Sequence, residues 1–404
     1  MTAPSKLSAI EPYRVLFPIA WLGALISVGL WMLVSVSHKL SWGIAAYPAS
    51  LHAYGVFATF VLPAVSGFLL TALPRFTGTP LPSSVLVGSV TLAFLGSLAA
   101  FLSGRIILLC LFGAMALGIT LFFARSGMLG SNTGLPSYLK AFLPAGLAAA
   151  FLGWLLILVG LSLRDLAPGV YYEPFLLSGR SLLFYSSISL IVLGAGSRIA
   201  VTIQANDHPD RHTWRRFLEE NRTEPYLVTA LILSGALLEI AGYSLGEDRS
   251  GTLVRAGALL QFSAMFYWLV LRFRIYRNSF RRAISTGLWI AFWMLLMGLA
   301  SRVLTGAASV HWGHLFFVGG LALLIFSVMT RVVLSHGKWN LEIENRSLLV
   351  WVPVILLTLA AATRASAHLM PASYVNHLGY AAFLFCLAIL LWLFRFLILT
   401  IRNN

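Results

Sequence analysis

The chain has 404 residues, of which 59% are hydrophobic and only 10% are charged. Apolar runs long enough to cross a bilayer recur from end to end, which excludes a soluble domain and predicts a single all-α, polytopic transmembrane domain over residues 1–404. The net charge of +15 would suggest nucleic acid in a soluble protein, but the basic residues lie in short loops between apolar runs, so we expect membrane lipids and no nucleic acid as partners.

The apolar runs predict about twelve membrane-spanning helices, counted with a length of roughly 20 residues per span. In chain order, the predicted spans are Val15–Val36, His52–Leu73, Val85–Leu102, Ile106–Ala124, Ala141–Leu163, Ser181–Val201, Tyr226–Leu245, Ala256–Leu271, Ala283–Leu304, Trp312–Met329, Leu348–Thr363 and Val375–Leu393. The third and fourth are separated only by Ser103-Gly104-Arg105, and the eighth is short.

Basic residues in the loops predict the orientation of the spans. They follow the sixth, eighth, tenth and twelfth spans, at Arg211, Arg215, Arg216, Arg222, Arg272, Arg274, Arg277, Arg281, Arg282, Arg331, Lys338, Arg346, Arg395 and Arg402. The opposite loops are less basic and contain Asp165, Glu173, Glu247 and Asp248. Because cytoplasmic loops carry the excess of Lys and Arg, we expect both termini in the cytoplasm.

The histidines divide unevenly between the two sides of this topology. Six of the nine fall at outer ends of spans or in outer loops, namely His38, His52, His311, His314, His368 and His377, whereas His208, His212 and His336 fall on the inner side. A single one of these is as well explained by an ordinary interfacial side chain, but a neutral imidazole near hydrocarbon is costly without a partner. Their shared level therefore favours a metal site on the outer side.

His52 and His314 are the leading candidates for that site, because they open the second and tenth spans. Facing imidazoles from two helices can share one metal, and haem iron is a leading choice. His311 precedes His314 by three residues and shares its helix face, so it ligates a second haem or a copper, or simply faces the outer water. His368 and His377, with His38, are candidates for a second centre.

Three further charged residues belong to the candidate site. Glu239 is the acid well inside an apolar run, where it conducts protons, binds a metal or forms a buried pair with an arginine such as Arg302. Arg105 and Arg302 lie at outer ends of spans, where they bind haem propionates or serve as interfacial arginines.

Two segments resemble the NnrS family. His52-Ala53-Tyr54, followed by Gly-Phe-Leu-Leu-Thr-Ala-Leu-Pro-Arg-Phe-Thr-Gly over Gly67–Gly78, resembles the second helix of that family, His-x-His-Glu-Met and then Gly-Phe-Leu-Leu-Thr-Ala-x-Pro-x-Trp-Thr-Gly. His314, Gly319 and the run from Ser327 to His336 resemble the family's His-x4-Gly and Ala-Val-Met-Thr-Arg-x-x-Leu-Gly-His. The Gly104-Arg105 pair and the Gly196-Ser197-Arg198 segment occur in the same order along the chain as the Gly-Arg and Gly-Gly-Arg segments of the family.

The resemblance implies a fold similar to the catalytic subunit of haem-copper oxidases and nitric oxide reductases, and an association with haem, copper and defence against nitric oxide. The family residues that carry over are His52, Arg105, Arg198, His314, Arg331 and His336. Tyr54 stands where the family has its second histidine and Gly55 where it has glutamate; Val201 and Gln204 also depart from the pattern. If that histidine and glutamate bind a second metal, this chain keeps the haem and lacks that metal.

We therefore expect a haem-binding protein of the bacterial inner membrane that handles nitric oxide or a related small redox ligand. The haem would be non-covalent haem b, because the chain has no Cys-x-x-Cys-His attachment motif; copper or a second haem stays open. Quinol is the expected electron donor if the chain is a nitric oxide reductase or related oxidoreductase, with Glu239 as a catalytic residue. The alternatives are a transporter whose outer histidines bind cargo or protons, and a non-catalytic haem-dependent sensor or assembly factor.

Overall fold

The computed structural model describes residues 11–40, 49–129, 135–167, 169, 171–204, 223–249, 251–277, 282–305 and 309–402. All regular secondary structure in these residues is helical. Twelve helices are long and apolar enough to cross a membrane, so the predicted all-α fold with twelve spans is confirmed. Several residues that the predicted topology assigned to the inner side lie outside the described residues, namely Arg211, Arg215, Arg216, Arg222, Arg281, His208 and His212.

The first six spans contain nine α-helices and three π-helical segments. They are α1 (Pro12–Leu40); α2, η1 and α3 (Ala49–Val56, Phe57–Val61, Leu62–Thr77); α4 (Ser84–Leu102); α5 (Ile106–Leu129); α6 (Ser137–Leu166); and α7, η2, α8, η3 and α9 (Glu173–Ser181, Leu182–Ser186, Ser187–Ile191, Val192–Gly196, Ser197–Gln204). The helices extend past most of the predicted apolar runs, because an α-helix continues into the polar interface beyond the hydrocarbon layer.

The last six spans follow the same plan. They are α11 (Glu224–Ser244); α12 and η5 (Thr252–Phe266, Tyr267–Arg272); α13 (Ala283–Leu304); α14, η7 and α15 (Ser309–His314, Leu315–Ala322, Leu323–His336); α17 with the short η8 (Leu348–Ser366, Ala367–Leu369); and η9 with α18 (Pro371–Ser373, Tyr374–Ile401). The four-residue helix α16 (Ile343–Arg346) precedes α17. The predicted short eighth span, Ala256–Leu271, runs from Thr252 to Arg272.

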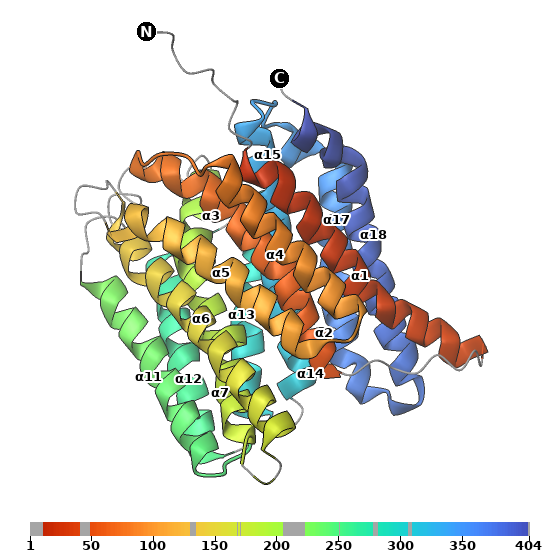
Figure 1. Cartoon of the computed structure of the whole chain (residues 1–404). Helices are drawn as coiled ribbons and strands as arrows, with labels where there is room; N and C mark the ends of the chain where they lie inside the picture. Colours follow the sequence, from red (N-terminus) through yellow and green to blue (C-terminus); the bar gives the residue numbers. More distant parts are fainter. Residues whose placement is uncertain are drawn as a thin grey trace.

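The two ends of the chain meet at one end of the helix bundle (Figure 1). Arg14 in α1 donates hydrogen bonds of 3.1 Å to the backbone oxygens of Ile401 and Arg402. We call the opposite end of the bundle, where α2 and α14 begin, the distal end. An even number of spans is consistent with termini on one side of a membrane, and the assignment of that side to the cytoplasm stays a prediction.

The second, sixth and tenth spans form the centre of the bundle. Their most apolar windows are 89%, 72% and 78% buried, whereas the other nine range from 33% to 61%. These three central spans also contain η1, η2, η3 and η7, four of the five π-helical segments in the described residues. Single π-turns inside α-helices are rare and are frequently found at functional sites. The centre of the bundle is therefore where a site is expected.

A proline accounts for the irregular backbone of η1. Pro63 has no N–H for the carbonyl of Thr59 four residues earlier, which an α-helix would require. In η1 the backbone hydrogen bonds join residues five apart instead of four, since the N–H of Leu62 donates to the carbonyl oxygen of Phe57. Gly23 of α1 lies directly against this segment, and a Cβ at Gly23 would stand only 2.0 Å from the Thr59 oxygen. A glycine is thus required there for α1 to pack on the second span.

Candidate functional site

Four of the predicted histidines gather at the distal end. His52 lies in α2, His311 and His314 in α14, and His368 in η8, and α2 and α14 both lie at this end of the bundle (Figure 1). His52 and His314, which are far apart in the sequence, lie near enough for a charge on one ring to affect the other. The structure therefore places His52 and His314, which were predicted from the sequence to act as a pair, at the same end of the bundle.

Backbone hydrogen bonds determine the tautomers of these two rings. His52 Nδ1 lies 3.3 Å from the carbonyl oxygen of Ser27 in α1, and His314 Nδ1 lies 2.9 Å from that of Val310. A carbonyl oxygen can only accept, so each Nδ1 must carry the proton, and the lone pair of the neutral ring is on Nε2. Metal-binding histidines commonly donate their other ring N–H in this way. Both rings therefore have the tautomer that a histidine bound to metal through Nε2 would have.

His311 and His368 stack on each other, with ring centroids 4.9 Å apart and planes 10° from parallel. Their tautomers differ. His368 Nδ1 lies 2.9 Å from the carbonyl oxygen of Ala365, which leaves its lone pair on Nε2. His311 Nδ1 instead accepts from Arg364 Nη1 at 3.3 Å, because a guanidinium has no acceptor. Of the two, His368 has the better tautomer for binding a metal through Nε2.

Arg364, near the end of α17, is the residue of this cluster that the sequence did not single out. Besides its contact with His311, it is hydrogen-bonded to Tyr374. Its charge acts on three of the rings, those of His52, His311 and His314. In the part of the chain that the structure describes, Arg364 forms no ion pair with an acidic side chain. The cluster is therefore suited to binding an anionic group. In the sequence, Arg364 could have been noticed as a basic residue at the same predicted end of the spans as the histidines.

The other predicted residues of this level lie apart from the cluster or on its margin. His38 is exposed at the end of α1, and Arg105 is exposed in the turn between α4 and α5. His377 contacts Tyr380, and its buried Nδ1 has no hydrogen-bond partner among the described residues. Over the same residues, no three His, Cys, Asp or Glu side chains come together in a way that could hold a metal ion. A centre that takes two histidines stays compatible with this geometry.

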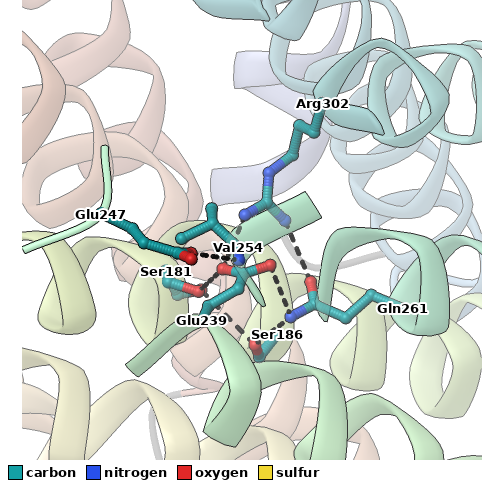
Figure 2. Close-up of polar contacts among 7 residues, drawn as sticks. All are labelled: Ser181, Ser186, Glu239, Glu247, Val254, Gln261 and Arg302. Atoms are coloured by element: carbon teal, nitrogen blue, oxygen red, sulfur yellow. Dashed lines mark hydrogen bonds and ion pairs between the residues drawn. The ribbon is translucent and has the colours of Figure 1, made fainter. Parts of the chain in front are cut away.

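Glu239 lies at the centre of a buried polar network, which Figure 2 shows. Arg302 of α13 donates to its Oε2 at 2.7 Å, Gln261 of α12 donates to its Oε1 at 3.2 Å, and Ser181 of α7 donates to Oε2 as well. Arg302 also donates to Gln261 Oε1 at 3.0 Å, and Gln261 to Ser186 at 3.3 Å. Of the roles considered for Glu239, the structure shows the buried pair with Arg302.

Two glycines allow this network to form. Gly235 of α11 and Gly257 of α12 face each other so closely that a Cβ on either would lie 2.6 Å or less from the other's carbonyl oxygen. Each is followed four residues later by a polar member of the network, Glu239 and Gln261. Residues four apart share a helix face, so the close crossing of the two backbones places the carboxylate against the amide.

Tyr185 connects this network to the histidine cluster. The guanidinium carbon of Arg302 lies 3.8 Å from the centroid of the Tyr185 ring. The same ring contacts Phe316 and Phe317 of η7, at 5.5 and 5.4 Å, and its hydroxyl lies close to Gly313, beside His314. The ion pair therefore supports the helix that carries His314, and the guanidinium of Arg302 is engaged by protein groups.

The positions that depart from the resembled pattern have their own packing. The hydroxyl of Tyr54 accepts a 2.7 Å hydrogen bond from Arg180 Nε, and its ring stacks on Phe184. At Gly55, a Cβ would stand 2.4 Å from the ring of Phe101, so no side chain fits without rearrangement. Neither position presents a metal ligand of the histidine or carboxylate kind.

The inner-side residues that carried the resemblance have local partners near the termini. Arg331 forms an ion pair with Glu344 of α16; burial raises the pKa of this carboxyl, and the arginine opposes that shift. The Arg198 guanidinium lies 5.4 Å from the Phe76 ring. His336 contacts Arg75 at 3.3 Å, and Arg75 pairs with Glu11. Arg198 and Arg331 thus both have protein partners.

Comparison with known families adds one finding. The family model described as NnrS protein matches residues 9–403, which is nearly the whole chain. Among curated proteins, none matches this chain.

Proposed function

The chain belongs to the NnrS family, which makes it a membrane protein related to nitric oxide, and from this premise we propose that it binds one non-covalent haem b between His52 and His314. The observation that supports the proposal is the pair of Nδ1 contacts to the carbonyls of Ser27 and Val310, which place the lone pair of each neutral ring on Nε2, as in many metal-binding histidines. Iron held by two imidazoles is one of the ligations that proteins use for haem.

Arg364 is the residue we propose for the haem propionates. Arg364 is half-buried and has no acidic partner among the described residues, and carboxylates bind arginine bidentately. Arg364 lies beside the histidines, whereas Arg105 is exposed and Arg302 is already paired with Glu239. The expectation of propionate contacts at Arg105 and Arg302 is therefore replaced, in this proposal, by Arg364.

The proposed role is the handling of nitric oxide or a related small redox ligand in a bacterial inner membrane, with quinol as electron donor. Bound haem would supply one-electron chemistry. His52 and His314 would hold the haem, and a centre held by two histidines would be suited to passing electrons. Glu239 acts as a positioning residue for Arg302 and Tyr185. The packing of Tyr54 and Gly55 argues against a copper ion at these two positions.

The test is an optical spectrum and metal content of the full chain purified in detergent, followed by reduction with a quinol and assay of nitric oxide consumption. The proposal expects one haem b per chain, no stoichiometric copper, reduction by quinol and loss of nitric oxide. Haem without consumption would indicate a sensor or assembly factor. Absence of haem would overturn the proposal and favour a transporter.

A further inference from the structure

An apolar cavity of about 50 Å³, partly open rather than fully enclosed, lies among the three central spans. Every residue that lines it is apolar, including Val61 and Phe68 from the second span, Ile188 and Val192 from the sixth, and Leu324 and Met329 from the tenth. No member of the histidine cluster or of the Glu239 network lines it. The cavity is thus distinct from the histidine cluster and from the Glu239 network.

Three π-helical segments contribute to the wall of the cavity. Phe57 and Val61 belong to η1, Val192 and Gly196 to η3, and Leu321 to η7. The cavity therefore coincides with a backbone irregularity in each of three helices, a kind of irregularity that is frequent at functional sites. A packing gap beside one small side chain in regular helices would not involve π-helical segments of three different spans.

The lining determines what can occupy the cavity. A buried water needs two to four polar partners, and apolar cavities stay dry and take apolar guests such as xenon. A cavity that holds benzene is roughly three times larger, at about 150 Å³. We propose that this cavity binds an uncharged diatomic gas, which is nitric oxide if the proposed function, on which this identification rests, is correct.

The cavity lies close to the proposed centre. Phe57 follows His52 by five residues and Leu321 follows His314 by seven, which at 1.5 Å per residue is roughly 8 and 10 Å along each helix. Three phenyl rings continue from the cavity wall: Phe57 and Phe184 are 5.5 Å apart, and Phe184 and Phe317 are 6.1 Å apart. A gas held in the cavity is thus about two helical turns or less from the level of the histidines.

Crystals of the full chain under xenon pressure test the proposal directly. Wild type should bind xenon in the cavity, and Ala64→Leu, which adds a side chain to its wall, should lose that xenon. Ala195→Leu fills the cavity from the sixth span and provides the same test if Ala64→Leu does not fold. Ala148→Leu is the matched control, because Ala148 is exposed on the surface of α6, and it should keep the xenon.

A second readout uses flash photolysis of nitric oxide from the haem-loaded protein. Filling the cavity should abolish the slow phase of geminate rebinding, in which gas returns to the haem from the cavity, while the haem spectrum stays that of wild type, and Ala148→Leu should keep that phase. Wild type without xenon would overturn the gas site and leave the haem proposal untouched. Xenon in haem-free protein but not in haem-loaded protein would also overturn it, since the porphyrin edge would then fill the cavity. Xenon in a protein that never contains haem would support an apolar gas site and overturn the proposed function.

Discussion

Arg302 donates a 2.7 Å hydrogen bond to Glu239, and the two side chains are only 8% and 0% exposed. The pair joins α11 to α13, and Gln261 of α12 bonds to both partners. A buried charge that loses its partner is strongly destabilising, even where the intact pair contributes little by itself. Glu239 is therefore expected to act on the stability of the bundle and on the position of Tyr185.

Glu239→Gln should lower the free energy of unfolding by about 3–5 kcal/mol, because Arg302 would be left buried without a counter-charge. Thermal unfolding of the purified protein measures the loss. Asp165→Asn is the matched control, since the Arg164–Asp165 pair is 40% and 43% exposed, and exposed pairs contribute about 0–1 kcal/mol. Unchanged stability with reduced turnover would contradict the positioning role and favour proton conduction by Glu239.

Gly23→Ala should destabilise the protein by about 1–3 kcal/mol, the usual cost of overpacking, because the new Cβ would collide with the Thr59 carbonyl. Gly88→Ala in α4 is the control: no atom lies within 4 Å of its added Cβ, and removal of a helical glycine should stabilise by roughly 0.5–1 kcal/mol. Melting curves of the two variants should move in opposite directions. A tolerated Gly23→Ala would show that α1 does not pack on η1 so closely.

Arg364→Gln should reduce the haem that survives purification, because it removes the proposed partner of the propionates. Arg364→Lys should retain part of it, since a lysine keeps the charge without the bidentate geometry. The pyridine haemochrome assay gives the haem per chain. Arg105→Gln, at an exposed arginine of the same end, should match wild type. Equal loss in the Arg105 and Arg364 variants would argue for a general electrostatic effect.

Reporter fusions test the predicted topology. A fusion after Asn404 should report the cytoplasm, and a fusion between α6 and α7, within residues 167–172, should report the opposite side, because the arginine-rich loops must stay inside. Signals from the same side for both fusions would refute the orientation and remove the argument that the histidines face outward.

The fold followed from the lengths of the apolar runs, because hydrocarbon admits few spanning structures other than helices. Runs of this length were enough to find twelve spans, including the pair joined by Ser103-Gly104-Arg105 and the short eighth. The π-helical segments were not predicted. Pro63 was their one local signal, and a proline inside a helix more often signals a kink; the shape of η1 depends on Gly23, which is far away in sequence.

The candidate site was predicted in part. His52 and His314 were paired from their positions at the mouths of two spans, and Arg302 was named as a partner for Glu239. Gln261, Ser181 and Tyr185 were not predicted, because the packing of helices selects which side chains of different spans meet. Arg364 was not predicted either, because an arginine at the end of a span usually lies at the membrane interface.

Optical and electron paramagnetic resonance spectra of the His52→Ala and His314→Ala variants test the central claim most directly. Oxidised wild type should show a low-spin haem with two nitrogen ligands, and each variant should lose its haem or convert it to high spin. His336→Ala, near the termini, and His311→Ala, whose Nδ1 is engaged by Arg364, should keep the wild-type spectrum. Wild-type spectra from both the His52 and His314 variants would contradict the account.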